Sequence, residues 1–218
     1  MSVTALTFLI TATFLFVGFI IVSSFNFKKR FQKEYHLRSH FPYEFNYQGR
    51  YQDNIYGNLL YALFVVCIIV FFVFFNSNFN NGYLIFALIA GGITLVSLTA
   101  LVYIPIDQLR LHMSVAAIAL IFSLGLSFAI VLASYNKYKD SSSIPALISL
   151  IISAVVTLIF VILLLNPKLA HWADMDKETK KDGTVVLVRP KWFVLAYSEW
   201  MMFFLYLISL ASLIVETI

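Results

Sequence analysis

Hydrophobic residues in this chain fall into six long blocks separated by shorter polar stretches. Each block matches or exceeds the roughly 20 residues that a helix needs to cross the hydrocarbon core of a bilayer. Backbone polar groups in lipid must bond to each other, so the blocks are predicted to be helices. The predicted spans are residues 4–24, 56–75, 83–104, 113–134, 144–166 and 192–215.

Composition places the chain among membrane proteins. Of its 218 residues, 61% are apolar and 12% charged, with a mean hydropathy of +0.88, whereas soluble domains carry about 25% charged residues. Too little polar sequence remains outside the spans for a separate soluble core. We therefore expect one all-α polytopic membrane domain over residues 1–218. The first span is followed by Lys28 and Lys29 rather than preceded by charge, so we interpret it as a retained anchor.

Charge is distributed unevenly between the two sides of the predicted bundle. Thirteen of the fifteen Lys and Arg residues lie in the loops after spans one, three and five, and only Lys137 and Lys139 lie on the other side. By the positive-inside rule, the long loops 25–55 and 167–191 are predicted to be cytoplasmic and both termini to be outside. We expect a plasma-membrane protein, and the frequent use of Phe, Asn, Lys and Ile suggests a bacterial one.

The net charge of +4 reflects these basic residues at the predicted cytoplasmic face. Basic residues at the cytoplasmic face attract anionic lipid head groups, which are the expected partners. The same residues are too dispersed to form a nucleic-acid footprint, so no nucleic acid is expected.

The first long loop contains two patterns. Phe27, Phe31 and Tyr35 recur every four residues among cations, which predicts an amphipathic helix that continues the first span along the membrane surface. The stretch Phe41–Tyr47 then alternates rings with polar residues, which predicts an extended strand with four rings on one side.

The second long loop contains a strand signal. Asp182-Gly183 is a turn signal, and β-branched residues follow it up to Val188. This strand is predicted to pair either with residues 41–47 or back on residues 168–178.

Rings and cations near the predicted cytoplasmic surface are candidates for lipid or membrane-protein contacts. Aromatic side chains are enriched at this depth, and we expect those of the first loop to cap the cytoplasmic end of the bundle. The candidates are Phe41, Tyr43, Phe45, Tyr47, Lys28, Lys29, Arg30, Trp192 and Trp200.

Glu199 is the only carboxylate well inside a predicted span. Counted from Lys191, it lies roughly 12 Å into the membrane along a helix. An ionised acid there costs about 2.5–3.5 kcal/mol or more, so Glu199 is expected to be protonated or to meet a donor from another helix. It is the candidate intramembrane functional acid, with a purely structural hydrogen bond as the alternative.

Other chemical signatures are weak. His36 and His40 are four residues apart, but no further ligands accompany them, so no metal site is expected. Phosphate-binding glycine loops, nucleophile elbows and paired catalytic carboxylates are missing from the sequence. We expect no cofactor, and we do not expect an enzyme.

A few residues resemble a known family. The segment Phe41–Phe45, His112 at the start of the fourth span and Ser198–Trp200 in the last are similar to the damage-regulated autophagy modulator family of eukaryotes. That resemblance implies cytoplasmic termini, which conflicts with the charge distribution, and no functional residue is carried over from it.

Three functions are compatible with these patterns. The favoured one is a non-catalytic membrane protein that binds lipid or acts as a subunit or regulator of a membrane assembly. The second is a small ion- or proton-coupled transporter using Glu199. The third is an intramembrane lipid-modifying enzyme, which requires Glu199 and His112 or a loop histidine to converge on one cavity.

Overall fold

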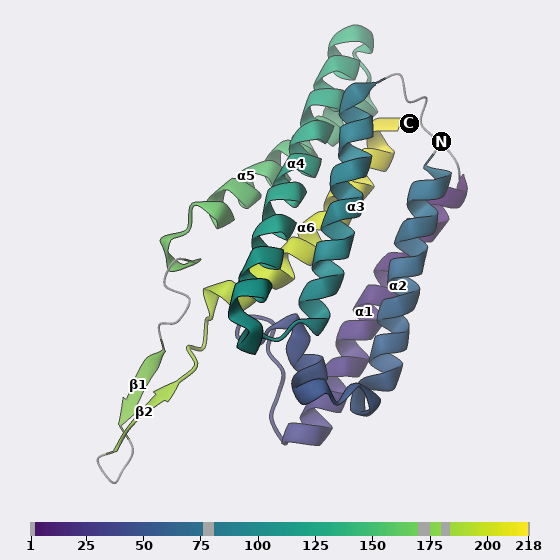
Figure 1. The fold of residues 1–218 in the computed structure, drawn as a ribbon. Coiled ribbons are helices and arrows are strands. Elements are labelled where there is room, and N and C mark those ends of the chain that lie inside the picture. The colour runs from purple at the N-terminus through teal and green to yellow at the C-terminus, as the bar shows by residue number, and fades with distance from the viewer. Residues whose placement is uncertain (1–2, 76–80, 170–174, 180–183, 218) are drawn as a thin grey trace.

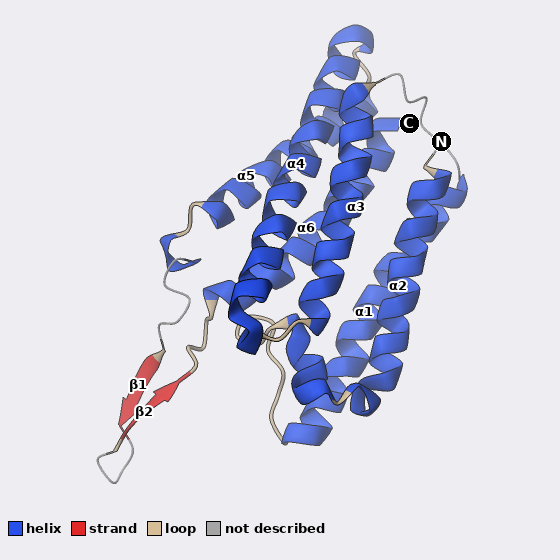
Figure 2. Ribbon diagram, viewed as in Figure 1, coloured by secondary structure: helices blue, strands red, loops and turns tan. Residues whose placement is uncertain are grey.

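Six apolar helices long enough to cross a membrane make up the body of the protein (Figures 1 and 2). The computed structural model describes residues 3–75, 81–169, 175–179 and 184–217, with the side chains of 47–49 and 216–217 excepted. The predicted six-helix membrane bundle is confirmed. The helices are α1 (Val3–Phe31), α2 (Ile55–Phe74), α3 (Gly82–Tyr103), α4 (Leu109–Ser141), α5 (Ile144–Leu164) and α6 (Val194–Thr217).

Two helices extend well beyond their predicted spans. α1 continues to Phe31 and stops where Gln32 adopts a positive φ of 54°, and α4 stops at Ser142 with a φ of 50°. Left-handed residues of this kind commonly end helices. Phe27 and Phe31 therefore belong to α1, while Tyr35 lies in the turns after it. The predicted continuation of the first span as a cationic and aromatic helix is therefore present as the last turns of α1, but it ends at Phe31, before Tyr35.

Helix α6 is the innermost element. In its most apolar stretch 72% of residues are buried, against 28–50% in the other helices. Aromatic rings join it to α1, with Phe16 stacked on Phe203 at 5.2 Å between ring centroids. On the other side, serine hydroxyls join it to its neighbours. Ser149 of α5 bonds to Ser134 of α4 at 2.8 Å and to Ser212 of α6 at 3.0 Å. Such contacts hold helices together where lipid supplies no hydrophobic drive.

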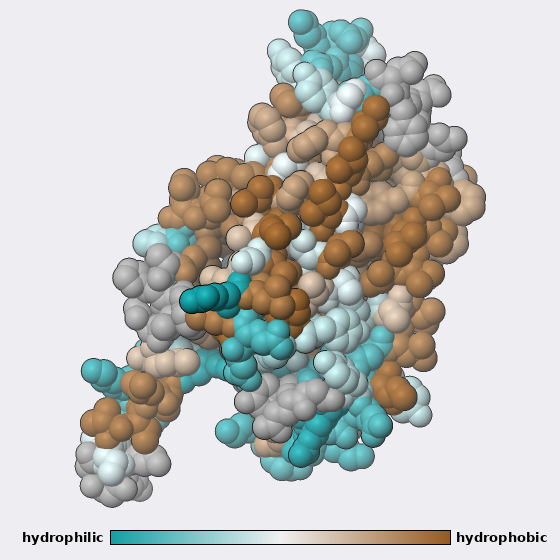
Figure 3. All heavy atoms as spheres, viewed as in Figure 1, coloured by the Kyte–Doolittle hydropathy of each residue, from teal (hydrophilic) through white to brown (hydrophobic). Residues whose placement is uncertain are grey.

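The outer helix faces are apolar. Figure 3 shows a hydrophobic belt across the middle of the visible surface, with hydrophilic residues at both ends. Between α2 and α3 lies an apolar groove of about 620 Å³, lined by residues such as Phe72 and Leu95. This distribution is that of a multi-pass membrane protein.

One end of the bundle, here called the basic end, carries the long connections 32–54 and 165–193 and the short connection before α4. The labelled chain ends lie at the opposite end (Figure 1). The connections contain the 3₁₀ segments η1 (Pro42–Gly49), η2 (Tyr51–Asn54), η3 (Ile106–Gln108) and η4 (Pro167–Leu169).

The aromatic stretch Phe41–Tyr47 forms η1 rather than a strand, so that prediction is wrong. Alternation predicts a strand when its polar positions face water, but Glu44 and Asn46 are buried here. The Glu44 N–H donates to the Phe41 carbonyl at 3.0 Å, and the Phe41 N–H donates to the Glu44 side chain at 3.3 Å. Pro42 stands at the first position of the turn, where its missing N–H costs little.

A β-hairpin projects from the basic end (Figure 2). Strand β1 (Asp176–Thr179) pairs antiparallel with β2 (Val185–Val188), with Asp176 opposite Val188. The second loop therefore folds back on itself, and the alternative pairing with residues 41–47 is wrong. The Asp182-Gly183 turn signal lies outside the described residues.

Candidate functional site

Glu199 meets a donor from another helix. The Nε2 atom of His112, in the first turn of α4, lies 2.7 Å from Oε1 of Glu199, in the second turn of α6. Both side chains are 0% exposed. The pair thus joins the central helix to α4 inside the bundle, near the basic end.

The hydrogen bonds of His112 restrict where the protons lie. Its Nδ1 is 2.8 Å from the Ile104 carbonyl, which can only accept, so Nδ1 carries a hydrogen. The contact between Nε2 and Glu199 then contains one shared proton, in either an imidazolium–carboxylate or an imidazole–carboxylic acid pair. Both forms are neutral overall, which makes the pair tolerable in a buried site. The second oxygen, Oε2, makes no hydrogen bond within the described part of the chain.

Two rings of the aromatic stretch cover this pair. Phe41 and Tyr43 approach the His112 ring edge-on, at centroid distances of 5.8 and 5.7 Å. Both are buried, as is Phe193, whose ring packs on Phe41 at 5.3 Å. The turn η1 therefore lies directly over the buried pair.

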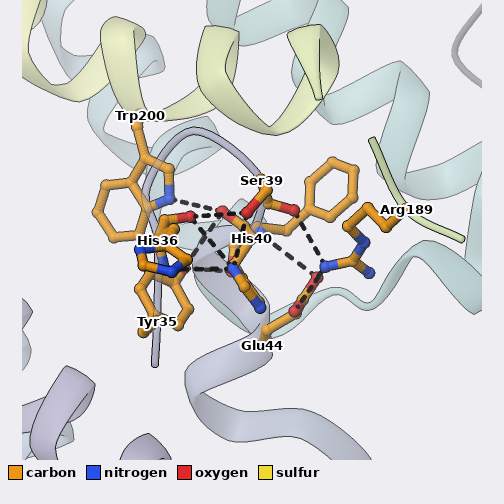
Figure 4. Close-up of polar contacts among 8 residues, drawn as sticks. Tyr35, His36, Ser39, His40, Glu44, Arg189 and Trp200 are labelled. Carbon is orange, nitrogen blue, oxygen red and sulfur yellow. Dashed lines mark hydrogen bonds and ion pairs between the residues drawn. The ribbon is translucent and has the colours of Figure 1, made fainter. Parts of the chain in front are cut away.

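Four successive backbone carbonyls, those of residues 38–41, fix the segment that precedes η1. We call this set of contacts the 38–41 latch, and Figure 4 shows the contacts of Ser39 and His40. Each carbonyl accepts a hydrogen bond from a group outside the segment, and three of the four donors come from residues 189–200. The bonds are Phe193 N–H to Arg38 O at 2.8 Å, Arg189 Nη1 to Ser39 O at 3.0 Å, Trp200 Nε1 to His40 O at 2.9 Å and Tyr35 OH to Phe41 O at 2.7 Å.

Arg189 connects the latch to Glu44. Its Nη1 lies 2.7 Å from Oε1 and 3.0 Å from Oε2 of the carboxylate. The Arg189 side chain is 34% exposed and that of Glu44 only 9%. The guanidinium also lies 5.9 Å from the ring centroids of Phe41 and Phe193. It is thus held between two rings and one carboxylate, a setting that suits Arg better than Lys.

Beside the latch lies a cavity of about 780 Å³, which we call the basic pocket. Four cationic side chains line it, together with two histidines and two carboxylates, and apolar groups from the end of α1 and from η3 complete its walls. The lining includes Lys33, Arg38, Arg189, Lys191, His36, His40, Glu44, Asp107, Phe27, Phe31, Ile106 and Tyr43. Such a mixture of cationic and apolar lining suits an amphiphilic anion.

Burial changes the acid–base properties of the pocket residues. Desolvation raises the pKa of Glu44 above its ordinary value, although the nearby Arg189 acts in the opposite direction. Desolvation lowers the pKa of His40, and the charge of Arg189 lowers it further. Burial also raises the pKa of Tyr43 and keeps its hydroxyl neutral. Both effects favour the uncharged form of His40.

The residues predicted to contact lipid or a partner separate into two groups. Phe41, Tyr43, Phe45 and Trp200 are buried, so their rings pack inside the protein rather than along the bilayer interface. Trp192 is 57% exposed and lies two residues before α6 begins, where an interfacial ring is expected. The side chain of Tyr47 is outside the described residues.

The three predicted cations lie in the last turn of α1. Lys28 bonds to Glu34 at 3.1 Å, and Arg30 lies 3.7 Å from Asp53. Lys29 is exposed and lies outside the pocket lining.

Sequence reasoning identifies only part of the site. Glu199 is expected to need a donor, and His112 is named with it only in the enzyme alternative, while Arg189 enters only as one of the basic residues of the second loop. One signal was present: His112 and Glu199 are ionisable residues at similar depth, each near the basic end of its helix. Nothing in the sequence indicated that Arg189 and Trp200 would bond to the carbonyls of residues 38–41.

The fold and site define a multi-pass membrane protein with a closed proton-sharing pair beneath a basic pocket. Among the described residues, no cluster of three or more His, Cys, Asp or Glu side chains could hold a metal ion. Comparison with protein-family models, curated proteins and solved structures finds no match. The resemblance in the sequence therefore gains no support from these comparisons.

Proposed function

We propose that this is a non-catalytic integral membrane protein whose basic pocket binds the anionic head group of a membrane lipid. The observation that carries the proposal is the lining of the pocket, in which Lys33, Arg38, Arg189 and Lys191 surround one cavity. Cations near the membrane surface each contribute about 1 kcal/mol to binding anionic lipid. The rings of Phe27 and Phe31 offer an apolar wall for the part of the lipid next to its head group.

The latch supports binding by a preformed site. Each carbonyl of residues 38–41 is bonded, so the wall that carries Arg38 and His40 is fixed by contacts within the protein. A preorganised site loses less conformational entropy on binding. The pocket is thus suited to recognise a head group rather than to fold around one.

The burial of the His112–Glu199 pair favours a positioning role over the transporter and enzyme alternatives. Both side chains are 0% exposed, and neither lines the basic pocket. A coupled transporter or a hydrolase needs its acid within reach of water or substrate. The pair instead holds α4 to α6 and supports the rings beneath the pocket.

We further propose a bacterial plasma-membrane location, with the basic end in the cytoplasm and both chain ends outside. The support is the distribution of Lys and Arg between the two ends. This orientation places the basic pocket against the leaflet surface whose anionic lipids it would bind.

A role as subunit or regulator of a membrane assembly has one feature in its favour. The hairpin projects from the basic end, and Val185 and Leu187 are exposed on β2. Replacing both by Ser would reduce the size of the native complex on a blue-native gel if this face binds a partner. An unchanged complex would remove this second candidate.

Lipid binding is tested with the purified protein in detergent. Short-chain phosphatidylglycerol should bind, and short-chain phosphatidylcholine should not. The double substitution Lys33→Gln and Arg38→Gln should weaken phosphatidylglycerol binding about 30-fold, since two charges of about 1 kcal/mol each are lost.

The control is Lys29→Gln, which removes the same charge at the same end but outside the pocket. Its affinity should stay within about twofold of the unmodified protein, because solvent and salt screen a distant exposed charge. Equal weakening in the control and the pocket variant, or equal binding of both lipids, would overturn the proposal.

A further inference from the structure

We propose that the basic pocket selects a lipid whose head group carries a phosphate monoester over one whose phosphate is a diester. This inference rests on the proposed lipid-binding function and names the chemistry of the ligand. It concerns how many negative charges the pocket can neutralise and how many donors it can present to one phosphate.

The charge of the pocket exceeds what a diester needs. Four Lys and Arg side chains face two carboxylates, those of Glu44 and Asp107, so two positive charges remain unbalanced. A phosphate monoester carries about −1.5 to −2 at neutral pH, while a diester carries a single negative charge. Only the monoester neutralises the pocket.

Only one of the two pocket carboxylates forms an ion pair with a pocket cation among the described residues. Glu44 is bound by Arg189, while Asp107 forms no ion pair with Lys33, Arg38 or Lys191 within the described residues. Those three cations lie on exposed residues around the pocket opening. An entering phosphate would therefore meet them without first displacing a carboxylate.

Arg189 also keeps donors for a ligand. Its three hydrogen bonds to Ser39 and Glu44 all use Nη1. Among the described residues no hydrogen bond uses its Nε or Nη2, and arginine offers two parallel donors to a phosphate from such positions. A monoester presents three terminal oxygens to these donors, whereas a diester presents two.

The size of the pocket indicates a ligand larger than a phosphate ion. The cavity of about 780 Å³ exceeds the needs of phosphate alone. A monoester on a glycerol, sugar or isoprenoid lipid therefore satisfies the geometry.

The test compares four probes on the purified protein in detergent at neutral pH: dioctanoyl phosphatidic acid, dioctanoyl phosphatidylglycerol, glycerol 3-phosphate and inorganic phosphate. Phosphatidic acid should bind about fivefold more tightly than phosphatidylglycerol, since it adds about one charge of about 1 kcal/mol. The two water-soluble phosphates should bind more weakly than phosphatidic acid because they lack the apolar part.

Variants separate pocket selectivity from general attraction. Lys191→Gln should reduce the preference for phosphatidic acid towards unity, and Lys29→Gln should preserve it. Equal affinity for the two lipids would overturn the monoester inference and leave lipid binding intact. If glycerol 3-phosphate binds as tightly as phosphatidic acid, the ligand is a soluble phosphate ester rather than a lipid. If neither lipid binds, the proposed lipid-binding function is overturned.

Discussion

At the scale of single residues, Glu199 shows how a buried acid is accommodated in this bundle. It shares a proton with His112 at 2.7 Å, and His112 in turn is fixed by the Ile104 carbonyl at 2.8 Å. The pair is neutral in both of its proton arrangements, so it stays in an apolar interior at modest cost. Removing either member leaves the other buried without its ionisable partner.

We predict that Glu199→Ala lowers the free energy of unfolding by about 3–5 kcal/mol, the usual cost of breaking a buried pair. Thermal or denaturant unfolding in detergent measures this. The matched control is Ser209→Ala, a buried serine of the same helix that bonds only to the Leu205 carbonyl at 2.9 Å.

A double-mutant cycle tests whether His112 and Glu199 stabilise the protein as a pair. His112→Ala should cost a similar amount, and the double variant should cost less than the sum of the two. Additive costs would contradict a shared proton between them.

His40 should make stability depend on pH. Burial lowers its folded pKa below the ordinary 6.5, so on acidification the unfolded chain takes up the proton first. Its contribution is therefore complete above pH 6.5 and is lost as the pH falls through 6.5 towards the folded pKa. From about pH 7.5 to about pH 5.5 the melting temperature of the unmodified protein should fall more than that of His40→Asn. Parallel curves for the two proteins would contradict a partly buried His40 with a lowered pKa.

At the scale of elements, the aromatic stretch shows where reading a pattern fails. Alternating rings predicted a strand, but Glu44 and Asn46 are buried and bond to Arg189 and Asn58. Those partners are distant in sequence, so no local pattern contains them. Hairpin β1–β2 was predicted correctly as one of two alternatives, because its turn and strand residues are close together in the chain.

Helix ends provide a prediction at this scale. Ser142 ends α4 with a φ of 50°, a conformation that costs a non-glycine residue free energy. Ser142→Gly should raise the free energy of unfolding by about 0.5–1 kcal/mol. The neighbouring Ser143 has a φ of −67°, so Ser143→Gly should give no gain in the same unfolding measurement. Stabilisation by both substitutions would contradict the backbone explanation.

At the scale of the whole molecule, hydrophobicity alone predicted the six helices, since lipid imposes their length and hydrogen bonding. The predicted helix boundaries were less accurate, because α1 and α4 continue beyond the apolar spans to Gln32 and Ser142. Glu199 was recognised from its cost in lipid. The basic pocket could not be predicted, because it unites residues 27–44, 106–107 and 189–191 only after the chain has folded.

Orientation is tested by cysteine labelling of intact cells in a Cys67→Ser background. With a membrane-impermeant maleimide, Lys139→Cys should be labelled from outside and Lys177→Cys only after permeabilisation. Both positions are exposed, so accessibility depends on the side of the membrane. The reverse pattern would place the basic pocket on the outer surface.

The most direct test of the account is to find where an anionic lipid contacts the protein. A phosphatidic acid probe with a diazirine at the start of one acyl chain would be photo-crosslinked in bilayers and its attachment sites mapped by peptide mass spectrometry. The account predicts crosslinks at the pocket walls, in residues 27–44 and 106–107, that are lost in the Lys33→Gln, Arg38→Gln variant. Crosslinks spread over the outer helix faces, unchanged by that variant, would contradict it.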